Sequence, residues 1–294
     1  DPILEPNIIK MPLTTEVETP QFKYFYAISP ELRQVVSLMR EFAENNVYRL
    51  YLLGGPGSGK TSVAYYYWLC RNKGKFISVN LTAESTDDKA ALKSLLCGHV
   101  TGAQGTTSSR EGALAFAEDG VCFLDESHGV TGVVMQTLME VLDSGQYLPF
   151  GGTKKRMLNC AVLMASNRSW ETLRNQMQLD EYARLGTTII QIKDLAARLE
   201  DLIAVASTTL SKFAGQCTSW VPPEGLTPQA WQAITSCSWK GNTRTLIRVI
   251  ESAAISFASE AGANSLIEEK HIRDALAIWE PESHPSESIY TSFK

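Results

Sequence analysis

Short apolar runs alternate with segments of helical apolar spacing along the first two thirds of the chain. The runs of strand length, bounded by polar or turn residues, are 49–53, 75–79, 121–124, 160–165 and 187–192. The segments predicted as helices are 30–44, 62–70, 88–97, 111–118 and 131–143. Because continuous apolar runs are typical of strands buried on both faces, this alternation predicts a parallel sheet covered by helices.

From residue 194 onward the pattern is helical only. The predicted helices are 194–214, 227–236, 242–260 and 268–279, with Pro222-Pro223 as a break and Pro228 as a helix start. The sequence therefore predicts an α/β fold, a parallel sheet sandwiched by helices, followed by a small all-helical lid domain. The expected divisions are an extended lead-in (1–27), the α/β domain (28–193), the lid domain (194–280) and a tail (281–294).

A glycine-rich stretch joins the first predicted strand to the helix that follows it. Its residues, which match G-x-x-x-x-G-K-[ST] at every fixed position, are Gly54, Gly55, Pro56, Gly57, Ser58, Gly59, Lys60 and Thr61. Glycines let backbone N–H groups surround a phosphate without a Cβ in the way, and the helix N-terminus adds partial positive charge. Lys60 would reach the β- and γ-phosphates, and the Thr61 hydroxyl would ligate Mg²⁺.

The alternative is a glycine turn that joins strand and helix by chance. A match at all four fixed positions of this eight-residue motif, between a strand and a helix in the required order, disfavours that alternative, so the stretch predicts a nucleotide-binding P-loop. We therefore expect ATP and Mg²⁺ as cofactors, with these eight residues and Ser62 in contact with the nucleotide.

Three other predicted strands are also followed by polar residues. These residues are Asn80, Asp125-Glu126 and Asn167. In an open parallel sheet the ligand crevice lies outside the carboxyl ends of the strands, so these residues should meet the P-loop at one edge. Asp125 is the expected carboxylate for Mg²⁺, and Glu126 can polarise an attacking water. The alternative, an ordinary turn at a strand end, is less plausible because a P-loop lies upstream.

Composition and charge limit the classes of protein. With 27 Lys and Arg against 32 Asp and Glu, the net charge of −5 argues against a chain that is basic as a whole for nucleic-acid binding. Six scattered cysteines without a C-x-x-C pair favour a reducing, cytoplasmic compartment and no structural zinc. No apolar run approaches membrane-spanning length, so we expect no membrane partner.

Several further motifs occur in a familiar order and spacing. They are Gly98-His99, Glu111–Gly120, Phe123–Glu126, Leu138–Tyr147, Phe150–Lys154, Ala165–Arg168, Ala183–Leu185, Leu195–Leu202 and Trp239–Arg244. With the P-loop they make the chain, over roughly residues 28–255, resemble the AAA+ ATPases. Within that group the chain is similar to the central domain of bacterial enhancer-binding proteins, which drive the alternative-sigma-factor form of RNA polymerase.

The resemblance implies roles for four residues. Asn80 matches the asparagine that holds the catalytic glutamate until a partner is engaged, and Asn167 matches the sensor beside the γ-phosphate. Arg184 matches an arginine that reaches the neighbouring subunit's nucleotide, and Arg244 matches the lid arginine that senses phosphate in its own subunit. An arginine in such a place stabilises charge on the transferring phosphoryl group. Taken singly, each arginine is also compatible with a solvated or salt-bridged surface position.

The sequence departs from the family pattern in two places. Members usually carry a second arginine just upstream of Arg184; this chain has Met177 or Gln178 at that position, and Arg174 is the residue that could substitute for it. Sigma-contacting members carry Gly-Ala-Phe-Thr-Gly-Ala in the loop after Gly-His, where this chain has Gly102-Ala-Gln-Gly-Thr-Thr107. Gln104 thus replaces the aromatic residue that contacts the sigma factor, which argues against ordinary sigma-factor activation.

Three functional hypotheses follow. The favoured one is an ATP-hydrolysing ring, a hexamer or another closed oligomer, that remodels a protein or nucleic-acid client through loop 98–110 and hairpin 146–156. The second is an enhancer-binding-type transcription activator with a diverged sigma-contact loop. The third is an ATP-gated switch or scaffold that hydrolyses slowly. DNA binding through Lys154-Lys155-Arg156 is a side possibility, since three basic residues on a hairpin are more often solvated charge.

Overall fold

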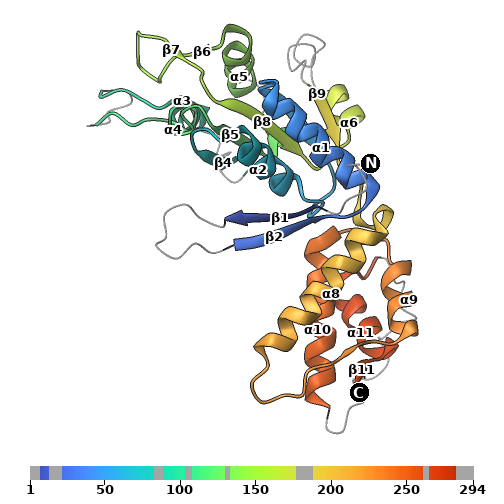
Figure 1. Ribbon diagram of the computed structural model, residues 1–294. Coiled ribbons are helices and arrows are strands. Elements are labelled where there is room, and N and C mark those ends of the chain that lie inside the picture. The colour runs from blue at the N-terminus through green and yellow to red at the C-terminus, as the bar shows by residue number, and fades with distance from the viewer. Residues whose placement is uncertain are drawn as a thin grey trace. The chain divides into compact units, whose positions relative to one another are not determined.

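A computed structural model describes residues 7–12, 22–82, 89–102, 108–129, 133–176, 188–260 and 265–282 (Figure 1). The chain forms two compact units. The sheet unit comprises Val35–Gly54 and Lys60–Ile192, and the lid unit comprises Asp1–Gln34, Gly55–Gly59 and Lys193–Lys294. Five residues of the P-loop thus group with the lid unit, while the divisions expected at 27, 193 and 280 stay predictions.

A five-stranded parallel sheet forms the centre of the sheet unit. Its strands are β3 (Arg49–Leu53), β4 (Phe76–Asn80), β5 (Val121–Asp125), β8 (Ala161–Ser166) and β9 (Thr188–Gln191). Their order is β4-β5-β8-β3-β9, with every neighbouring pair parallel. The predicted strands and the predicted parallel arrangement are both confirmed, and β3, which leads into the P-loop, lies inside the sheet.

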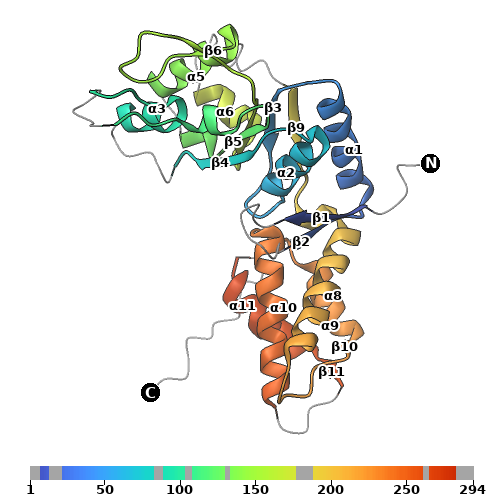
Figure 2. The ribbon, with the colours of Figure 1, turned by 60° about the vertical axis from the view of Figure 1, so that its left-hand side comes forward.

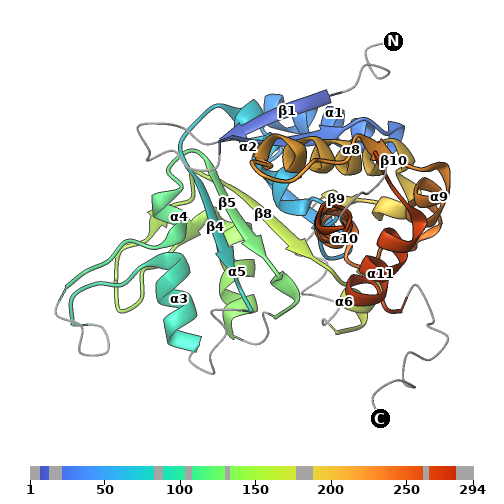
Figure 3. The same cartoon turned by 90° about the horizontal axis from the view of Figure 1, so that it is seen from below.

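Helices cover both faces of this sheet. They are α1 (Pro30–Glu44), of which Val35 onward belongs to this unit, α2 (Lys60–Arg71), α3 (Lys89–Cys97), α4 (Ala113–Phe116), α5 (Val133–Ser144) and α6 (Trp170–Gln176). Tyr51 and Leu53 of β3 join a core with residues of α3, α4, α5 and α6. Leu50 and Leu52 point to the opposite face. Figure 3 shows α2 and α3 on opposite sides of β4 and β5.

Helix α6 was not among the predicted helices. Its start carries a recognisable signal, because the Ser169 hydroxyl accepts a hydrogen bond from the Thr172 N–H at 3.2 Å. A serine that satisfies a first-turn N–H is a typical N-cap. The predicted hairpin is confirmed: β6 (Gln146–Tyr147) pairs antiparallel with β7 (Arg156–Met157).

The lid unit begins with a β-ribbon. Strand β1 (Asn7–Pro12) pairs antiparallel with β2 (Phe22–Ala27), and β2 packs against α8. These residues were expected as an extended lead-in, and both segments are extended strands, whose pairing with each other was not predicted. Pro12 stands at the very end of β1, where a missing N–H disturbs the ladder least.

Helices make up most of the remaining lid unit. They are α8 (Leu199–Gln216), α9 (Pro228–Ser236), α10 (Asn242–Ser259) and α11 (Glu269–Trp279), which pack around a shared core (Figure 2). The helix predicted over 194–214 is instead a 3₁₀ turn, η4 (Leu195–Ala197), followed by α8. Two short parallel strands, β10 (Gly225–Leu226) and β11 (Leu266–Ile267), also correct the expectation of helices only.

The break between η4 and α8 falls at Arg198. Its backbone, with φ −132° and ψ 68°, is not helical. This break lets the Arg198 side chain reach the P-loop backbone, as described below. Among the described helices, none is long and apolar enough to cross a membrane.

Candidate functional site

The predicted site residues of the sheet unit follow the carboxyl ends of neighbouring strands. The β4–β5 register sets Asn80 opposite Asp125. Gly54 follows β3, and its N–H donates to the Ser166 carbonyl at the end of β8 at 3.2 Å. Asn167 comes directly after Ser166. The ends of four strands therefore bring these polar residues to one edge of the sheet.

The P-loop backbone needs glycine at several of its positions. Gly57 and Gly59 have φ values of +70° and +107°, in the region that favours glycine. A Cβ on Gly55 would lie 2.6 Å from Asp194 Oδ1, and a Cβ on Gly57 would lie 2.5 Å from the Gly241 carbonyl oxygen. Within the lid unit, the Gly241 backbone leaves no room for a side chain on Gly57, whereas a side chain on Gly55 would have to displace the Asp194 and Asn242 side chains.

The first turn of α2 supplies a donor set for phosphate. Lys60 is only 7% exposed, and its ammonium donates to the Gly54 carbonyl at 2.8 Å. Thr61 is exposed and Ser62 is half-buried on the same turn. A cation beside first-turn N–H groups fits the phosphates of a nucleotide, and the oxygens of Thr61 and Asp125 are ligand types that Mg²⁺ prefers.

Three side chains of the lid unit hold successive carbonyl groups of the P-loop. Asn242 Nδ2 donates to the Pro56 carbonyl at 3.0 Å. Thr243 Oγ1 donates to the Gly57 carbonyl at 2.6 Å, and Arg198 Nη2 donates to the Ser58 carbonyl at 3.0 Å. Since a trans peptide points its C=O and N–H in opposite directions, the N–H groups of Gly57 and Gly59 face away from these three side chains.

These lid contacts were missed in the sequence. Asn242 and Pro56 are 186 positions apart, and Arg198 and Ser58 are 140 apart, so no local pattern reveals either pairing. The segments that carry the three lid residues were nevertheless recognised as motifs in the sequence. These motifs are Leu195–Leu202 and Trp239–Arg244. The sequence could not reveal the acceptor atoms, because these are backbone carbonyl oxygens that no side-chain pattern marks.

Arg198 belongs to a buried ion pair. Its Nη1 lies 3.2 Å from Asp201 Oδ2, and both side chains are 2% exposed. Asp201 also accepts hydrogen bonds from the Ile28 and Ser29 N–H groups at 2.6 and 2.9 Å, and from the Ser29 hydroxyl at 2.6 Å. Burial lowers the pKa of Arg198, and the Asp201 carboxylate opposes this shift only in part. The pair ties the start of α1 to the P-loop within the lid unit.

The two carboxylates at the end of β5, Asp125 and Glu126, have different surroundings. Asp125 Oδ1 accepts the Glu126 N–H at 2.9 Å, while Glu126 itself has a left-handed φ of +53°. Glu126 Oε2 lies 3.3 Å from His128 Nδ1, which is also 3.2 Å from the Ser166 hydroxyl. Burial lowers the pKa of His128, and the Glu126 carboxylate only partly offsets that shift. Glu126 and His128 thus lie within ion-pair distance, and burial of the imidazole opposes its protonation there.

Of the remaining predicted residues, Asn80 and Arg244 lie in the described part of the chain. Asn80 Oδ1 accepts hydrogen bonds from the Thr82 N–H and hydroxyl at 3.0 and 2.9 Å. Arg244 is exposed in the first turn of α10, and its Cβ would lie 3.1 Å from a Cβ on Gly57. Arg184 and Gln104 lie outside the described residues. The roles assigned to all of these residues stay predictions.

The bases of the two predicted client elements are joined. His99 and Arg110 pair antiparallel across the base of loop 98–110, with N···O distances of 2.9 and 3.0 Å. The Val100 N–H donates to the Phe150 carbonyl at 3.1 Å, and the Phe150 N–H donates to the Gly98 carbonyl at 2.8 Å. Loop 98–110 and hairpin 146–156 therefore share one backbone network at their bases within the sheet unit.

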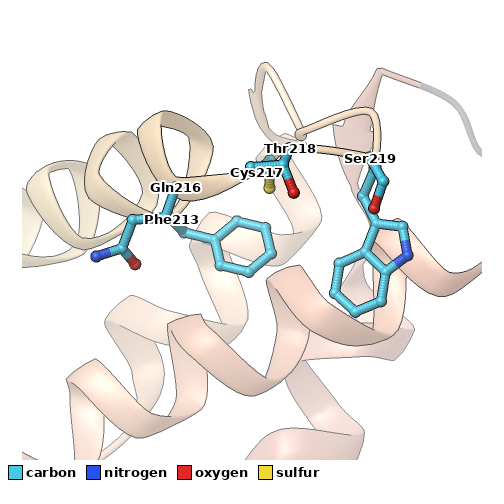
Figure 4. A pocket seen from close by; sticks show the side chains of 6 residues that line it. Phe213, Gln216, Cys217, Thr218 and Ser219 are labelled. Atoms are coloured by element: carbon cyan, nitrogen blue, oxygen red, sulfur yellow. The ribbon is translucent and has the colours of Figure 1, made fainter.

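Each unit also carries a surface pocket that contains none of the predicted nucleotide residues. The pocket of the lid unit, about 280 Å³, lies at the end of α8 and is lined by Phe213, Gln216, Cys217, Thr218, Ser219 and Trp220 (Figure 4). The pocket of the sheet unit, about 560 Å³, is lined by Leu114, Ala115, Glu118, Asp119, Tyr147, Arg156, Met157 and Asn159. The second pocket includes residues of both hairpin strands.

Two protein families together match almost the whole chain. Residues 25–191 match the family described as the Sigma-54 interaction domain, and residues 196–288 match the AAA+ ATPase lid domain. The transcriptional regulatory protein GlrR of Escherichia coli strain K12 is 29% identical over 246 residues, which cover 82% of this chain and 54% of GlrR. A Nif-specific regulatory protein of Rhodobacter capsulatus is 31% identical over 255 residues, 85% of this chain and 42% of that protein.

Solved structures support the same fold. The crystal structure of NtrX from Brucella abortus in complex with ADP has a TM-score of 0.73 at 22% identity, and covers 90% of this chain and 57% of that one. The chain spans about half the length of the curated relatives it matches.

Proposed function

Because this chain belongs to the Sigma-54 interaction domain family and carries an AAA+ ATPase lid domain, we propose that it hydrolyses Mg-ATP at the subunit interfaces of a ring and so remodels a macromolecular partner. The family match confirms the resemblance to AAA+ ATPases that the motifs indicated. One observation carries the proposal. The P-loop with Lys60 follows β3, and β5 ends at Asp125 with Glu126 directly after it, at the same edge of one parallel sheet.

The proposed chemistry divides between binding and water activation. Lys60 and the first-turn N–H groups of α2 would hold the β- and γ-phosphates, and Thr61 and Asp125 would ligate the metal. Mg²⁺, when bound, neutralises charge on the phosphate oxygens. Glu126 would take the proton of the attacking water as the general base. The NtrX structures with ADP and with ATP support a nucleotide in this fold.

We assign supporting roles to the residues that the resemblance indicated. Asn167 would stand beside the γ-phosphate, and Asn80, opposite Asp125 in the sheet register, would restrain Glu126 until the client is engaged. Arg244, beside Gly57, would report the phosphate within one subunit. Arg184 would act on the nucleotide of a neighbouring subunit, which is why we propose a ring.

Loop 98–110 and hairpin 146–156 form the proposed client surface. Their joined bases support a single output element, because a shift of either one strains the hydrogen bonds of the other. A second candidate function, an enhancer-binding-type transcription activator, is favoured by the relatives, which are transcriptional and Nif-specific regulatory proteins. Gln104 in place of the aromatic residue is the observation that separates the two candidates.

The test is capture of the client by a variant that binds ATP without hydrolysing it. Glu126→Gln would be incubated with RNA polymerase carrying the sigma-54 factor, in ATP and, as a control, in ADP. Retention in ATP alone, together with open-complex formation by the unmodified chain, supports the activator. A parallel incubation with a cell extract tests other clients: ATP-dependent retention of a protein or nucleic acid from the extract, with no retention of the polymerase, supports the remodeller. ATP-dependent self-assembly without any client and without turnover would overturn both and leave the switch.

A further inference from the structure

A buried carboxylate lies at the amino end of α10. Glu280, which follows α11, is 3% exposed. Its Oε2 accepts the Lys240 N–H at 3.0 Å, and its Oε1 accepts the Gly241 N–H at 2.9 Å. The Thr245 hydroxyl also donates to Oε1. All of these residues belong to the lid unit.

The backbone that Glu280 holds is a strained turn. Trp239 and Asn242 both have left-handed φ values, +50° and +53°, which are costly for residues other than glycine. Such a conformation persists only where its surroundings fix it. A carboxylate that accepts N–H groups at a helix N-terminus gains from charge-assisted hydrogen bonds and from the helix dipole. Glu280 therefore stabilises the turn 239–242 in the shape that α10 needs.

The same turn presents the side chains that hold the P-loop. Asn242 donates to the Pro56 carbonyl, and Thr243 donates to the Gly57 carbonyl. Asn242 Oδ1 in turn accepts the Leu195 N–H at 2.6 Å. A continuous series of contacts thus runs from Glu280 through turn 239–242 to two carbonyl groups of the loop.

From this series we infer that Glu280 is a positioning residue for nucleotide binding. It acts through Asn242 and Thr243, which fix the peptide orientation of the P-loop so that its N–H groups face away from the lid. The inference rests on the proposed use of this loop for ATP. A residue that only capped α10 would stabilise the helix without any effect on the loop. The capping role and the positioning role therefore predict different results for hydrogen exchange in the loop and for ATP affinity.

The first experiment follows the loop in the nucleotide-free chain. Glu280→Gln keeps the side-chain shape but loses the charge and one acceptor. We expect amide hydrogen exchange in a peptide covering Gly57–Lys60, where the Ser58 N–H donates to the Gly55 carbonyl at 3.2 Å, to become faster at Ser58 by about fivefold or more, the usual lower range of coupling between sites. The matched control is Glu268→Gln. Glu268 is also a carboxylate at a lid-helix N-terminus, in the capping box of α11. We expect the control to leave loop exchange unchanged.

The second experiment measures affinity for a non-hydrolysable ATP analogue. The Kd should rise by about fivefold or more in Glu280→Gln and stay within about twofold in Glu268→Gln. In a double-mutant cycle with Thr243→Val, the two effects on Kd should be strongly less than additive, because both changes release the same loop contact. Additive effects would overturn the inference.

Two further outcomes are distinguishable. Faster exchange confined to residues 240–246, with the loop unchanged, would make Glu280 only a helix cap and would overturn the inference. If Glu280→Gln does not fold, Thr245→Val removes a single contact to the same carboxylate, and the same comparison of loop exchange decides. Failure of the unmodified chain to bind the analogue would refute the proposed function, while loop exchange would still test the role of Glu280.

Discussion

At the scale of single residues, charge and geometry separate binding from catalysis. Lys60 is buried and bonded to the loop backbone, whereas Glu126 stands in a left-handed conformation beside the His128 imidazole. The first carries positive charge toward a phosphate, and the second carries a carboxylate that can accept a proton. Replacing each one should therefore affect a different measurement.

Lys60→Ala should abolish ATP binding, because the cation facing the phosphates is lost. Glu126→Gln should leave ATP affinity within about threefold and lower turnover by about 10² to 10⁴, the usual contribution of a general base. Titration of an ATP analogue and a steady-state phosphate-release assay separate the two. The matched controls are Lys73→Ala and Glu140→Gln, both exposed residues of the sheet unit. Normal turnover in Glu126→Gln would refute the assignment.

His128 should make stability depend on pH. Its pKa is lowered from about 6.5 by burial, so the unfolded chain binds this proton more readily than the folded chain. Stability is therefore lost as the pH falls below about 6.5 toward the folded pKa. In His128→Asn this contribution disappears, and the decrease in Tm between pH 7 and pH 5.5 should be smaller. Equal slopes in both proteins would show that His128 does not contribute.

At the scale of elements, the sequence predicted what local patterns encode. Continuous apolar runs identified all five strands of the sheet, and turn residues identified the hairpin. The β1–β2 pairing was missed because it depends on two segments meeting, not on either segment alone. The hydrogen bonds from Arg198, Asn242 and Thr243 to the P-loop were missed for the same reason. Their acceptors are backbone carbonyls far away in the sequence. Long-range partners, rather than element types, are what one sequence leaves undetermined.

The paired client elements lead to a prediction about coupling. Gln104→Ala with Thr106→Ala should leave basal ATP hydrolysis within about threefold, because no phosphate chemistry involves this loop. Client-dependent activity should be lost, as coupling between two sites is usually about 1–3 kcal/mol. Both activities would be measured on the same preparation. Arg156→Ala, on the hairpin strand β7, serves as the comparison. Survival of both activities in the loop variant would make the hairpin the better candidate.

At the scale of the whole molecule, the proposed ring makes activity depend on assembly. If Arg184 acts on a neighbour's nucleotide, ATP turnover per chain should rise with protein concentration. Mixing Arg184→Ala chains with Glu126→Gln chains should restore part of the turnover, because some interfaces then have both halves intact. Turnover and sedimentation would be followed over the same concentration range. Concentration-independent turnover by a monomer would leave Arg184 without a role in trans.

The buried pair of Arg198 and Asp201 also constrains how this family can evolve. Loss of Asp201 would leave the Arg198 cation buried with the Ser58 carbonyl as its described acceptor. Breaking a buried pair in this way costs about 3–5 kcal/mol. Loss of Arg198 would leave Asp201 with its donors at Ile28 and Ser29. Loss of the arginine first should therefore be tolerated better than loss of the aspartate first. Among related sequences, those that keep the aspartate without the arginine should outnumber those that keep the arginine without the aspartate.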